Sequence, residues 1–320
     1  MNDLHRSVMV CGPTFLDVVM ASLPHEPQLG QEIWVDHSRI CAGGAGNQAT
    51  ALAKLGVECQ LSTCLGEDLA GVTVQKTLEK AHVGLQYAER IDQQPVTVSL
   101  AWAGDRAMVT AGALTVASLP PELPVVPRIL IANLQTLSEN EETVKTWRKK
   151  GTIVIGNVGW DDSNQWDLTD LAPLTYCDYF IPNELEITHY GKNSQLANAI
   201  EYIRSNTHTE ATFVITQGAQ GVTIAEKNSP AWSMPALRVS VLDPTGAGDV
   251  FTAGFATGIL FSRSLRESVS FALFLASLSL SQPGGAGAAP TAQEIVNLLT
   301  TAQLPSTYAL DWVKNLPHNR

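Results

Sequence analysis

Short apolar runs alternate with amphipathic stretches along most of this 320-residue chain. Runs such as "SVMVCG", "RILIANL", "TIVIGNV" and "ATFVIT" are typical of buried strands. Helical patterns are expected over residues 47–55, 69–81, 139–150, 194–206, 247–261 and 265–280. Strands that alternate with helices favour a mostly parallel sheet with helices on both faces. We therefore predict an α/β fold, a three-layer, doubly wound, mostly parallel sheet.

Two β-rich segments, near residues 14–40 and 95–112, interrupt this alternation. Gln31–Ile40 alternates apolar and polar residues, the pattern of a half-exposed strand. "VTVSLAWA" and "RAMVT" are separated by Gly104 and Asp105, which is a hairpin signal. We expect these segments to form a small β-rich lid apart from the main sheet.

The composition narrows the function classes. Hydrophobic residues are 45% and charged residues 16% of the chain, as in a globular protein with a sizeable core. The net charge of −11 argues against a nucleic acid or an anionic membrane as partner, because both need a basic surface. A nucleotide ligand stays compatible, since it needs only a local anion site.

The cysteines and the apolar runs indicate a cytoplasmic location. The five cysteines are an odd number without CxxC spacing, which argues against disulfide or zinc frameworks and fits a reducing compartment. The N-terminus lacks the apolar run of a signal peptide. The longest apolar run, Val269–Leu280, is too short to cross a bilayer and is expected to be a buried helix.

The stretch "GGAGNQATALAKLG" contains Gly44-x-Gly46-x-x-Ala49, the spacing of a dinucleotide-binding loop. Glu67 and Asp68 lie about 20 residues further on, where such a fold places a ribose-binding acid. In that fold, however, the loop follows the first strand of its βαβ unit, whereas here a strand, a long loop and a second strand come first. An NAD site is therefore the weaker interpretation.

The stretch "DPTGAGDVFTAGF" (Asp243–Phe255) is the most informative part of the sequence, and it follows "LRVSVLD", which we expect to be a short strand. Gly246, Ala247 and Gly248 open a helix, so their backbone N–H groups can converge on an anion with the support of the helix dipole. Asp249 lies beside this anion hole and can accept a proton from an attacking hydroxyl, an arrangement suited to phosphoryl transfer. A capping aspartate after a glycine turn is the alternative. At a helix N-terminus we expect its pKa to stay low.

Three motifs in this order resemble the ribokinase-like (PfkB) family of carbohydrate kinases. They are "AGGAGNQATALAKLG", "NELE" (Asn183–Glu186) and "DPTGAGDVFTAGF", and the resemblance extends from about Val8 to Thr291. It implies one ribokinase-like kinase domain over residues 1–320 with the lid segments inserted. It also implies ATP and Mg²⁺ as cofactors, with the early glycines approaching a sugar rather than a pyrophosphate.

The resemblance assigns the substrate side of the site to four residues: Asp17, Gly43, Gly44 and Asn47. Asp17 and the Asn47 amide would bind sugar hydroxyls, and the two glycines would let backbone come close to them. The chain departs from many family members between the glycine pair and Asn47. It has only Ala45 and Gly46 there, without the lysine that ribokinases often carry, which leaves the sugar unidentified.

The resemblance assigns the nucleotide side to five residues: Asn183, Glu186, Thr216, Gly218 and Gly221. Glu186 would hold Mg²⁺ through water, since Mg²⁺ keeps its waters and uses few protein carboxylates. Helix capping by Asn183 and Glu186 is a compatible structural alternative. Asp243 and Thr245, with the later "PGGAGA" segment, resemble loops that bind a monovalent cation such as K⁺ in some relatives, and a plain structural turn is equally compatible.

Three functions fit these residues: an ATP-dependent sugar kinase acting on a hydroxymethyl group, a nucleoside kinase, and a non-catalytic sugar- or nucleotide-binding regulator. Trp34 and Trp102, on the candidate lid strands, could stack on a ligand or pack within a lid-mediated homodimer. The intact Asp249 favours an enzyme.

We expect the acceptor to carry no phosphate, because the early loops and the lid are poor in Arg and Lys. The hairpin has only Arg106, beside its turn. Arg39, just before the glycine loop, and Arg90 are the other candidates for a second anion site. Asp17 would repel a nearby phosphate.

Overall fold

The computed structural model describes residues 7–282, 284–300 and 304–317. The chain divides into two compact units. The first consists of Met1–Gly12 and Ser118–Ala236, and the second of Pro13–Ala117 and Leu237–Arg320.

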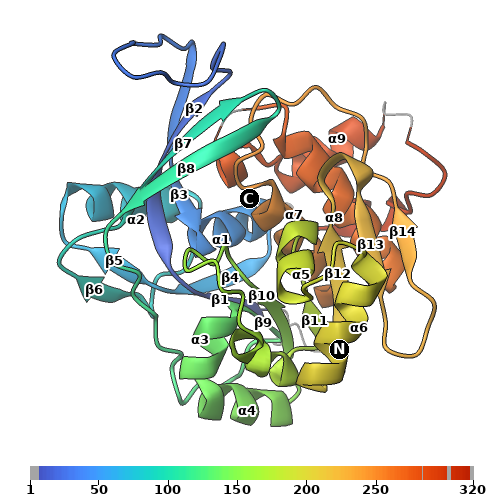
Figure 1. Cartoon of the computed structure of the whole chain (residues 1–320). Helices are drawn as coiled ribbons and strands as arrows, with labels where there is room; N and C mark the ends of the chain where they lie inside the picture. Colours follow the sequence, from blue (N-terminus) through green and yellow to red (C-terminus); the bar gives the residue numbers. More distant parts are fainter. Residues whose placement is uncertain (1–6, 283, 301–303, 318–320) are drawn as a thin grey trace. The chain divides into compact units, whose positions relative to one another are not determined.

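The first unit is built on a mostly parallel sheet (Figure 1). Its strands are β1 (Ser7–Cys11), β9 (Ile129–Asn133), β10 (Ile153–Asn157), β11 (Tyr179–Phe180), β12 (Thr212–Thr216), β13 (Val222–Ala225) and β14 (Trp232–Met234). Within this unit their order is β14-β13-β12-β11-β10-β9-β1, parallel from β1 to β12, with β13 and β14 antiparallel. Strands β9 and β12 are apolar runs that are almost wholly buried, as expected for a covered parallel sheet.

Helices follow these strands, as the alternating pattern predicts. They are α3 (Leu134–Glu139), α4 (Glu141–Lys149), α5 (Glu184–Tyr190) and α6 (Leu196–Thr207), with short 3₁₀ segments η2 (Leu168–Tyr176) and η3 (Gly218–Gln220). The helix expected over residues 139–150 is α4, whereas the preceding helix α3 was not expected. The Asn140 side chain bonds back to the Thr136 carbonyl at the junction of the two helices.

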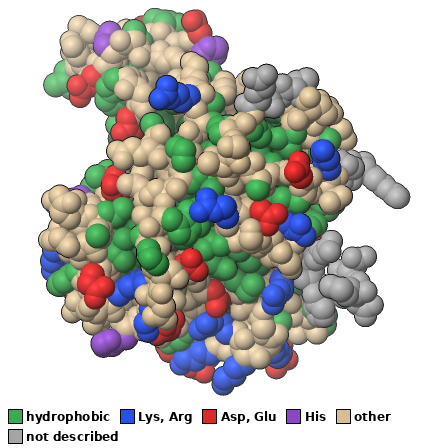
Figure 2. Space-filling model, turned by 90° about the vertical axis from the view of Figure 1, so that its right-hand side faces the viewer, with side chains coloured by type: hydrophobic (Ala, Val, Ile, Leu, Met, Phe, Trp, Pro, Cys, Tyr) green, Lys and Arg blue, Asp and Glu red, His purple; other side chains and the backbone are tan. Residues whose placement is uncertain are grey.

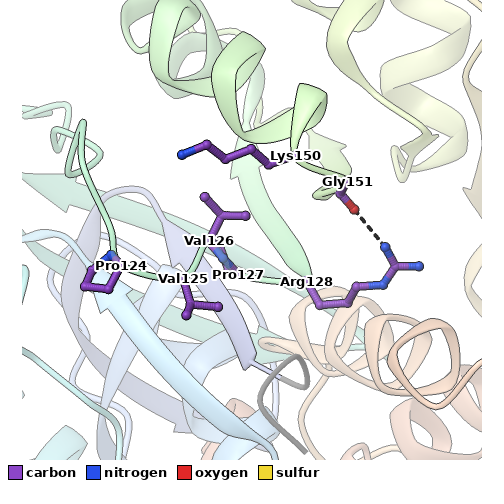
Figure 3. A pocket seen from close by; sticks show the side chains of 7 residues that line it. All are labelled: Pro124, Val125, Val126, Pro127, Arg128, Lys150 and Gly151. Atoms are coloured by element: carbon purple, nitrogen blue, oxygen red, sulfur yellow. Dashed lines mark hydrogen bonds between the residues drawn. The ribbon is translucent and has the colours of Figure 1, made fainter. Parts of the chain in front are cut away.

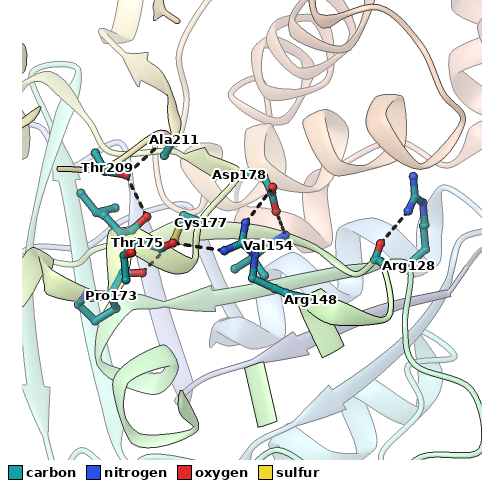
Figure 4. Close-up of polar contacts among 11 residues, drawn as sticks. Arg128, Arg148, Val154, Pro173, Thr175, Cys177, Asp178, Thr209 and Ala211 are labelled. Atoms are coloured by element: carbon teal, nitrogen blue, oxygen red, sulfur yellow. Dashed lines mark hydrogen bonds and ion pairs between the residues drawn. The ribbon is translucent and has the colours of Figure 1, made fainter. Parts of the chain in front are cut away.

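A polar network fixes the chain where it enters β11 (Figure 4). The Asp178 carboxylate accepts hydrogen bonds from Val154 N (2.8 Å) and from Arg148 Nη2 (3.4 Å). Arg148 Nη1 also donates to the Thr175 carbonyl (3.2 Å). These contacts fix the start of β11, which leads directly to Asn183.

A four-stranded sheet in the second unit contains both β-rich segments (Figure 1). Its strands are β2 (Thr14–Ala21), β3 (His37–Gly44), β7 (Val96–Trp102) and β8 (Asp105–Ala111), in the order β3-β2-β7-β8. Strands β7 and β8 are joined by Ala103 (φ 50°) and Gly104 (φ 84°), the left-handed pair of a type I′ hairpin turn. We call this sheet the lid.

The remaining elements of the second unit include α1 and α7, which contain parts of the two glycine-rich motifs. They are α1 (Ala45–Lys54), β4 (Glu58–Ser62), β5 (Cys64–Gly66), α2 (Leu69–Lys80), β6 (Glu89–Ile91), α7 (Ala247–Leu260), α8 (Leu265–Ser279), η4 (Gly285–Ala288), α9 (Ala292–Leu299) and η5 (Asp311–Asn315). Gly254 and Gly258 of α7 allow α8 to approach closely, since an added Cβ would come within 2.9 Å of Ala272 Cα and 2.6 Å of Ser268 Cα. Val269–Leu280 falls on this buried helix, as expected.

One expected strand begins later than predicted, at His37 instead of Gln31, and another is absent from the residues that the structure describes. Residues 31–36 are irregular, and Trp34 is 85% exposed there rather than placed on a lid strand. Residues 237–242, before the "DPTGAGD" stretch, form no strand among the described residues. In both places the alternation of apolar residues has no neighbouring strand with which to pair.

The distribution of surface charge, the cysteines and the helix lengths can be compared with the expectations from the sequence. Acidic and basic side chains are interspersed on the face that Figure 2 shows. All five cysteines are buried, and none of them forms a disulfide. In the described part of the chain, no helix has the length and apolar character that a membrane crossing requires.

Candidate active site

The "DPTGAGD" stretch forms the predicted helix start. Helix α7 begins at Ala247, two residues earlier than Asp249, and Gly246 is its N-cap with φ 73°. A Cβ on Gly246 would also come within 3.0 Å of Gly285 Cα, so both conformation and space require glycine. A Cβ on Gly248 would meet no atom within 4 Å. The space beside Gly248 is therefore open, which an anion bound at this helix start would need.

Two amides of α1 hold the Asp249 carboxylate. Asn47 Nδ2 donates to Oδ2 (3.2 Å) and Gln48 Nε2 donates to Oδ1 (3.0 Å). The Asn47 Oδ1 atom accepts from the backbone N–H of Ala286 (3.3 Å), which fixes the orientation of its amide. The structure thus brings Asn47 to the candidate base, and both carboxylate oxygens are oriented by neutral donors.

The expectation of a low pKa for Asp249 is wrong. Burial raises its pKa to about 6, against the lowering effects of the Gln48 and Asn47 hydrogen bonds and of Arg106. Removal from water disfavours the charged form more than the helix start favours it. A carboxylate with this pKa is a better proton acceptor than an ordinary aspartate.

Asp17 lies on β2 with its side chain 7% exposed, next to Gly43 of β3. A Cβ on Gly43 would lie only 2.1–2.2 Å from the Asp17 carboxylate atoms. Gly43 therefore leaves room for this carboxylate, a reason for glycine that the sequence did not suggest. Gly44 has φ 57°, and a Cβ there would lie 2.5 Å from the Pro13 carbonyl oxygen. Both glycines end a strand rather than forming a loop.

The two carboxyls of this region affect each other. Burial raises the pKa of Asp17 to about 7, and the charge of Asp249 raises it further, while Arg106 lowers it. Two partly desolvated carboxylates close enough to repel are typical of functional sites. Near neutral pH, Asp17 can therefore act as hydrogen-bond donor or acceptor toward a polar ligand.

Asp243 joins the two loops predicted to hold a monovalent cation. Its Oδ1 accepts from Thr245 N and its Oδ2 from Gly284 N, both at 2.8 Å, and its side chain is buried. Thr245 Oγ1 lies 2.9 Å from Ser99 Oγ of the lid. Lys54 Nζ donates to the carbonyls of Gly287 (2.6 Å) and Ala289 (2.7 Å), so an ammonium of the chain itself already binds part of the later loop. These contacts suffice for a structural turn.

The nucleotide-side residues gather in the first unit. Asn183 and Glu186 form a capping box at the start of α5: Asn183 N donates to Glu186 Oε2 and Glu186 N to Asn183 Oδ1, each at 2.8 Å. Burial raises the pKa of Glu186 to about 7, although the Asn183 N–H lowers it. The capping role is therefore real, and one oxygen of Glu186 is committed to it.

Thr216 brings the glycine turn to the same place, since Asn183 and Thr216 form a parallel bridge. Gly218 (φ 54°) and Gly221 (φ 98°) both need left-handed backbone. A Cβ on Gly221 would lie 2.0 Å from the Met234 carbonyl oxygen, whereas one on Gly218 would meet nothing within 4 Å. These residues lie at the carboxyl ends of β11 and β12, where ligands bind in open α/β sheets.

No simple metal cage accompanies these residues. Among the described side chains, no three His, Cys, Asp or Glu residues are close enough together to hold a metal ion. A single carboxylate such as Glu186 fits the indirect, water-mediated binding of Mg²⁺ that accompanies a nucleotide.

A separate pocket of about 600 Å³ lies in the first unit (Figure 3). Its lining includes Val125, Arg128 and Lys150, and Arg128 Nη1 donates to the Gly151 carbonyl (2.7 Å). None of the residues that line it is a predicted site residue. It has no part in the chemistry considered below.

Gln48 is the functional residue that sequence reasoning missed. Its side chain is buried and donates to Asp249. The sequence carries no signal for this role, because adjacent residues of a helix project about 100° apart and Asn47 alone does not imply that Gln48 faces the same carboxylate.

Comparisons with known proteins agree with this geometry. The model of the "pfkB family carbohydrate kinase" matches residues 6–292. The chain belongs to this family. It is a carbohydrate kinase, a phosphotransferase with an alcohol as acceptor, which confirms the predicted class of enzyme and excludes the NAD interpretation.

The names of the relatives of this kinase specify different acceptors. It is 24% identical over 320 residues to a ribokinase from Haemophilus influenzae, covering 93% of this chain and 100% of the relative. It is 26% identical over 282 residues to an ATP-dependent ribose-1-phosphate kinase from Halopiger xanaduensis, covering 86% and 92%. An ATP-dependent sugar kinase of the ribokinase family is therefore confirmed, and the sugar is not identified by these identities.

Solved structures confirm the fold. Arabidopsis thaliana ribokinase, complexed with ribose and ATP, matches with a TM-score of 0.72 at 23% identity, covering 93% of this chain and 100% of that one. A nucleoside kinase from Methanocaldococcus jannaschii matches with a TM-score of 0.70 at 19% identity, covering 94% and 100%. The predicted ribokinase-like α/β fold, with a mostly parallel sheet and a small lid sheet, is thus correct.

Proposed function

We propose that this kinase transfers the γ-phosphoryl group of ATP to a hydroxymethyl group of a non-phosphorylated sugar or sugar-like compound, with Asp249 as the base. The observation that carries the proposal is the hydrogen bonding of Asp249 to Asn47 and Gln48 at the start of α7. It orients a carboxylate of raised pKa beside the N–H groups of Gly246–Gly248.

The acceptor hydroxyl oxygen forms a bond to the γ-phosphorus as the bond from that phosphorus to the ADP oxygen breaks. The hydroxyl proton passes to the Asp249 carboxylate, and ADP leaves. The anion hole at Gly246, Ala247 and Gly248 stabilises the charge on the transferring group. Asp17, with Asn47, Gly43 and Gly44, would bind the remaining hydroxyls.

The nucleotide would be held by the residues at the ends of β11 and β12. Thr216, Gly218 and Gly221 support this, because their turn leaves Gly218 facing open space. Asn183 and Glu186 would hold phosphate and, through water, Mg²⁺, which supplies charge neutralisation of the phosphates when bound. A K⁺ requirement at Asp243 and Thr245 is a weaker proposal, since these loops are already joined without an ion. Assays in KCl and NaCl test it.

Two alternatives remain distinct. A nucleoside kinase would need an aromatic side chain for the base. Trp34 lies in an exposed irregular segment rather than on the lid. Trp102 ends β7 on the face of Val98, opposite to the face of Asp17. A non-catalytic regulator would not require an oriented base of raised pKa. Neither alternative has a specific observation in its favour.

The outer face of the lid supports a homodimer. Ile40, Val18, Val98 and Val109 stand in one row across the four strands, and Ile40 and Val109 are 59% and 70% exposed. An exposed apolar row on a sheet is typical of an interaction surface. Val109→Lys should convert a dimer to a monomer in light scattering. The five buried cysteines, none of which forms a disulfide, fit our proposal of a cytoplasmic location.

The deciding experiment is ADP formation against a panel of sugars, polyols and nucleosides. A sugar kinase turns over a sugar and loses that turnover on Asp249→Asn. Turnover of nucleosides alone would favour the first alternative, and saturable binding without ADP formation the second.

A further inference from the structure

Arg106 lies on the inner face of the lid, the face that also carries Asp17. The type I′ turn at Ala103 and Gly104 fixes the register of β7 and β8, which pairs Ala101 with Arg106 and Thr97 with Thr110. Paired residues in adjacent strands share a face of the sheet. The hydrogen bond between Thr97 Oγ1 and Thr110 Oγ1 (2.9 Å) is consistent with this assignment.

The same register extends to β2. Asp17 pairs with Thr97, and Val19 with Ser99, so Asp17 and Val19 share the face of Thr97 and Ser99. Residues on this face are buried in both central strands: Asp17, Val19 and Ala21 in β2, and Thr97, Ser99 and Ala101 in β7. Ser99 Oγ lies 2.9 Å from Thr245 Oγ1. Thr245 belongs to the segment Asp243–Asp249, which we call the catalytic loop. Arg106 therefore projects from the face of the lid that is turned to the catalytic loop.

The positive charge of Arg106 lowers the pKa of both carboxylates of the site, Asp17 and Asp249. Burial is the largest influence on the pKa of Asp17 and of Asp249, and the Arg106 guanidinium opposes it at each of them. In the described residues, this guanidinium has no hydrogen bond or ion pair of its own. It is thus a cation near the substrate-side residues whose donors are uncommitted.

The other cation of this face is differently placed. Arg39, in β3 at the opposite edge of the lid, pairs with Val19 and so shares the inner face. Its aliphatic part lies against Gly284, where an added Cβ would come within 3.1 Å of Arg39 Cγ. The stem of Arg39 therefore packs on the loop beside Asp243. Unlike Arg106, Arg39 is not among the charges that act on the pKa of Asp17 or Asp249.

We propose that Arg106 binds a carboxylate of the acceptor, so that the substrate is a sugar acid carrying both a carboxylate and the hydroxymethyl group that is phosphorylated. A neutral sugar offers a guanidinium only single, uncharged hydroxyl acceptors, whereas a carboxylate binds it through a charge-assisted bidentate pair. A phosphate monoester is disfavoured, because its dianion would meet Asp17 and Asp249 with one arginine to offset them. The inference rests on the proposed kinase function and narrows its substrate class.

The test compares a sugar, its aldonic acid and its phosphate monoester as acceptors for the wild-type kinase and for Arg106→Met and Arg106→Lys. Arg90→Met, on the separate strand β6, is the matched control. The wild type should prefer the acid. Arg106→Met should raise KM for the acid about 10–100-fold, as expected for a lost charge-assisted hydrogen bond. The KM for ATP should stay unchanged, the KM for the neutral sugar should change far less than the KM for the acid, and Arg106→Lys should restore part of the affinity.

Other outcomes overturn the inference. If kcat/KM is equal for the neutral sugar and the acid, and Arg106→Met changes neither, the proposed kinase function stands. In that case the sugar acid is not the substrate class. A preference for the phosphate monoester contradicts the carboxylate. An equal fall of kcat on all acceptors in Arg106→Met makes Arg106 a ligand of the transferring phosphoryl group instead.

Failure of all phosphoryl transfer would contradict the proposed function and still leave the inference testable. In that case, calorimetric titration of the sugar acid into the wild type and Arg106→Met measures binding without turnover. Binding that disappears in the variant supports the carboxylate site, and equal or absent binding refutes it.

Discussion

The side-chain amide of Gln48 donates a 3.0 Å hydrogen bond to the carboxylate of Asp249, across a separation of 201 positions in the sequence. Asn47 binds the other carboxylate oxygen from the same turn of α1. The helix that follows the early glycines thus positions the base at the start of α7. This contact ties the two family signatures to a single chemical centre.

Removal of the Gln48 hydrogen bond should make Asp249 a base only at higher pH. Gln48→Leu removes a neutral donor to a buried carboxylate and should raise the pKa of Asp249 by about one to two units. The pH profile of kcat should shift by that amount, with activity recovering at pH 9. Gln75→Leu, at an exposed glutamine of α2, is the control. An equal loss of kcat at every pH would show that Gln48 acts only on the structure.

The wild-type pH profile follows from the pKa of Asp249, which burial raises to about 6. The carboxylate accepts a proton only when it is ionised, so kcat should be full at pH 8 and fall as pH drops through about 6. An ordinary aspartate would keep its activity down to about pH 4. Rates measured from pH 4.5 to 9 at saturating substrate decide between these values.

Replacement of Asp17 should weaken substrate binding and stabilise the protein. Its pKa is raised from 3.8 to about 7, mainly by burial, so the folded state favours the protonated form. The penalty is absent below about pH 4, grows as the unfolded chain ionises, and is complete above about pH 7. Asp17→Asn should therefore raise the free energy of unfolding by up to about 4 kcal/mol at pH 8 and by little at pH 4. Urea unfolding at the two pH values measures this, and a destabilised variant at pH 8 would contradict it.

Gly43 should be required because of Asp17. A Cβ at Gly43 would lie 2.1–2.2 Å from the Asp17 carboxylate, so Gly43→Ala must displace that side chain. We expect a loss of about 1–3 kcal/mol in stability, as for overpacking, together with a higher KM for the sugar. The stability loss should shrink in an Asp17→Gly background, where the carboxylate is absent. Equal losses in both backgrounds would place the clash elsewhere.

Gly248 should be required for turnover rather than for folding. Its added Cβ would meet no atom within 4 Å, so Gly248→Val should fold, with unfolding transitions close to those of the wild type. The side chain would occupy the space where the phosphoryl group approaches, and kcat should fall about 10²-fold or more, as when an oxyanion donor is lost. A folded variant with normal kcat would place the anion hole at other residues.

The fold and the main motif were predictable because each leaves a local signal. Alternating apolar runs mark the strands of a parallel sheet, and Gly246–Gly248 before a helical pattern marks an anion site. Burial leaves no such signal. The raised pKa of Asp249, the contact of Gly43 with Asp17 and the hydrogen bond from Gln48 arise from residues far apart in sequence. The irregular residues 31–36 show the converse, since an alternating pattern forms a strand only when a neighbouring strand is present to pair with it.

The most direct test of the account is ADP formation by Asp249→Asn on the best acceptor of the panel. We expect kcat to fall about 10²–10⁴-fold, the usual share of general-base catalysis, while the KM for ATP and the unfolding transition stay close to wild type. Asn keeps the size of Asp249 and its place beside Asn47 and Gln48 but cannot accept the proton. A variant that folds, binds ATP and retains near-normal kcat would contradict the assignment of Asp249 as the base.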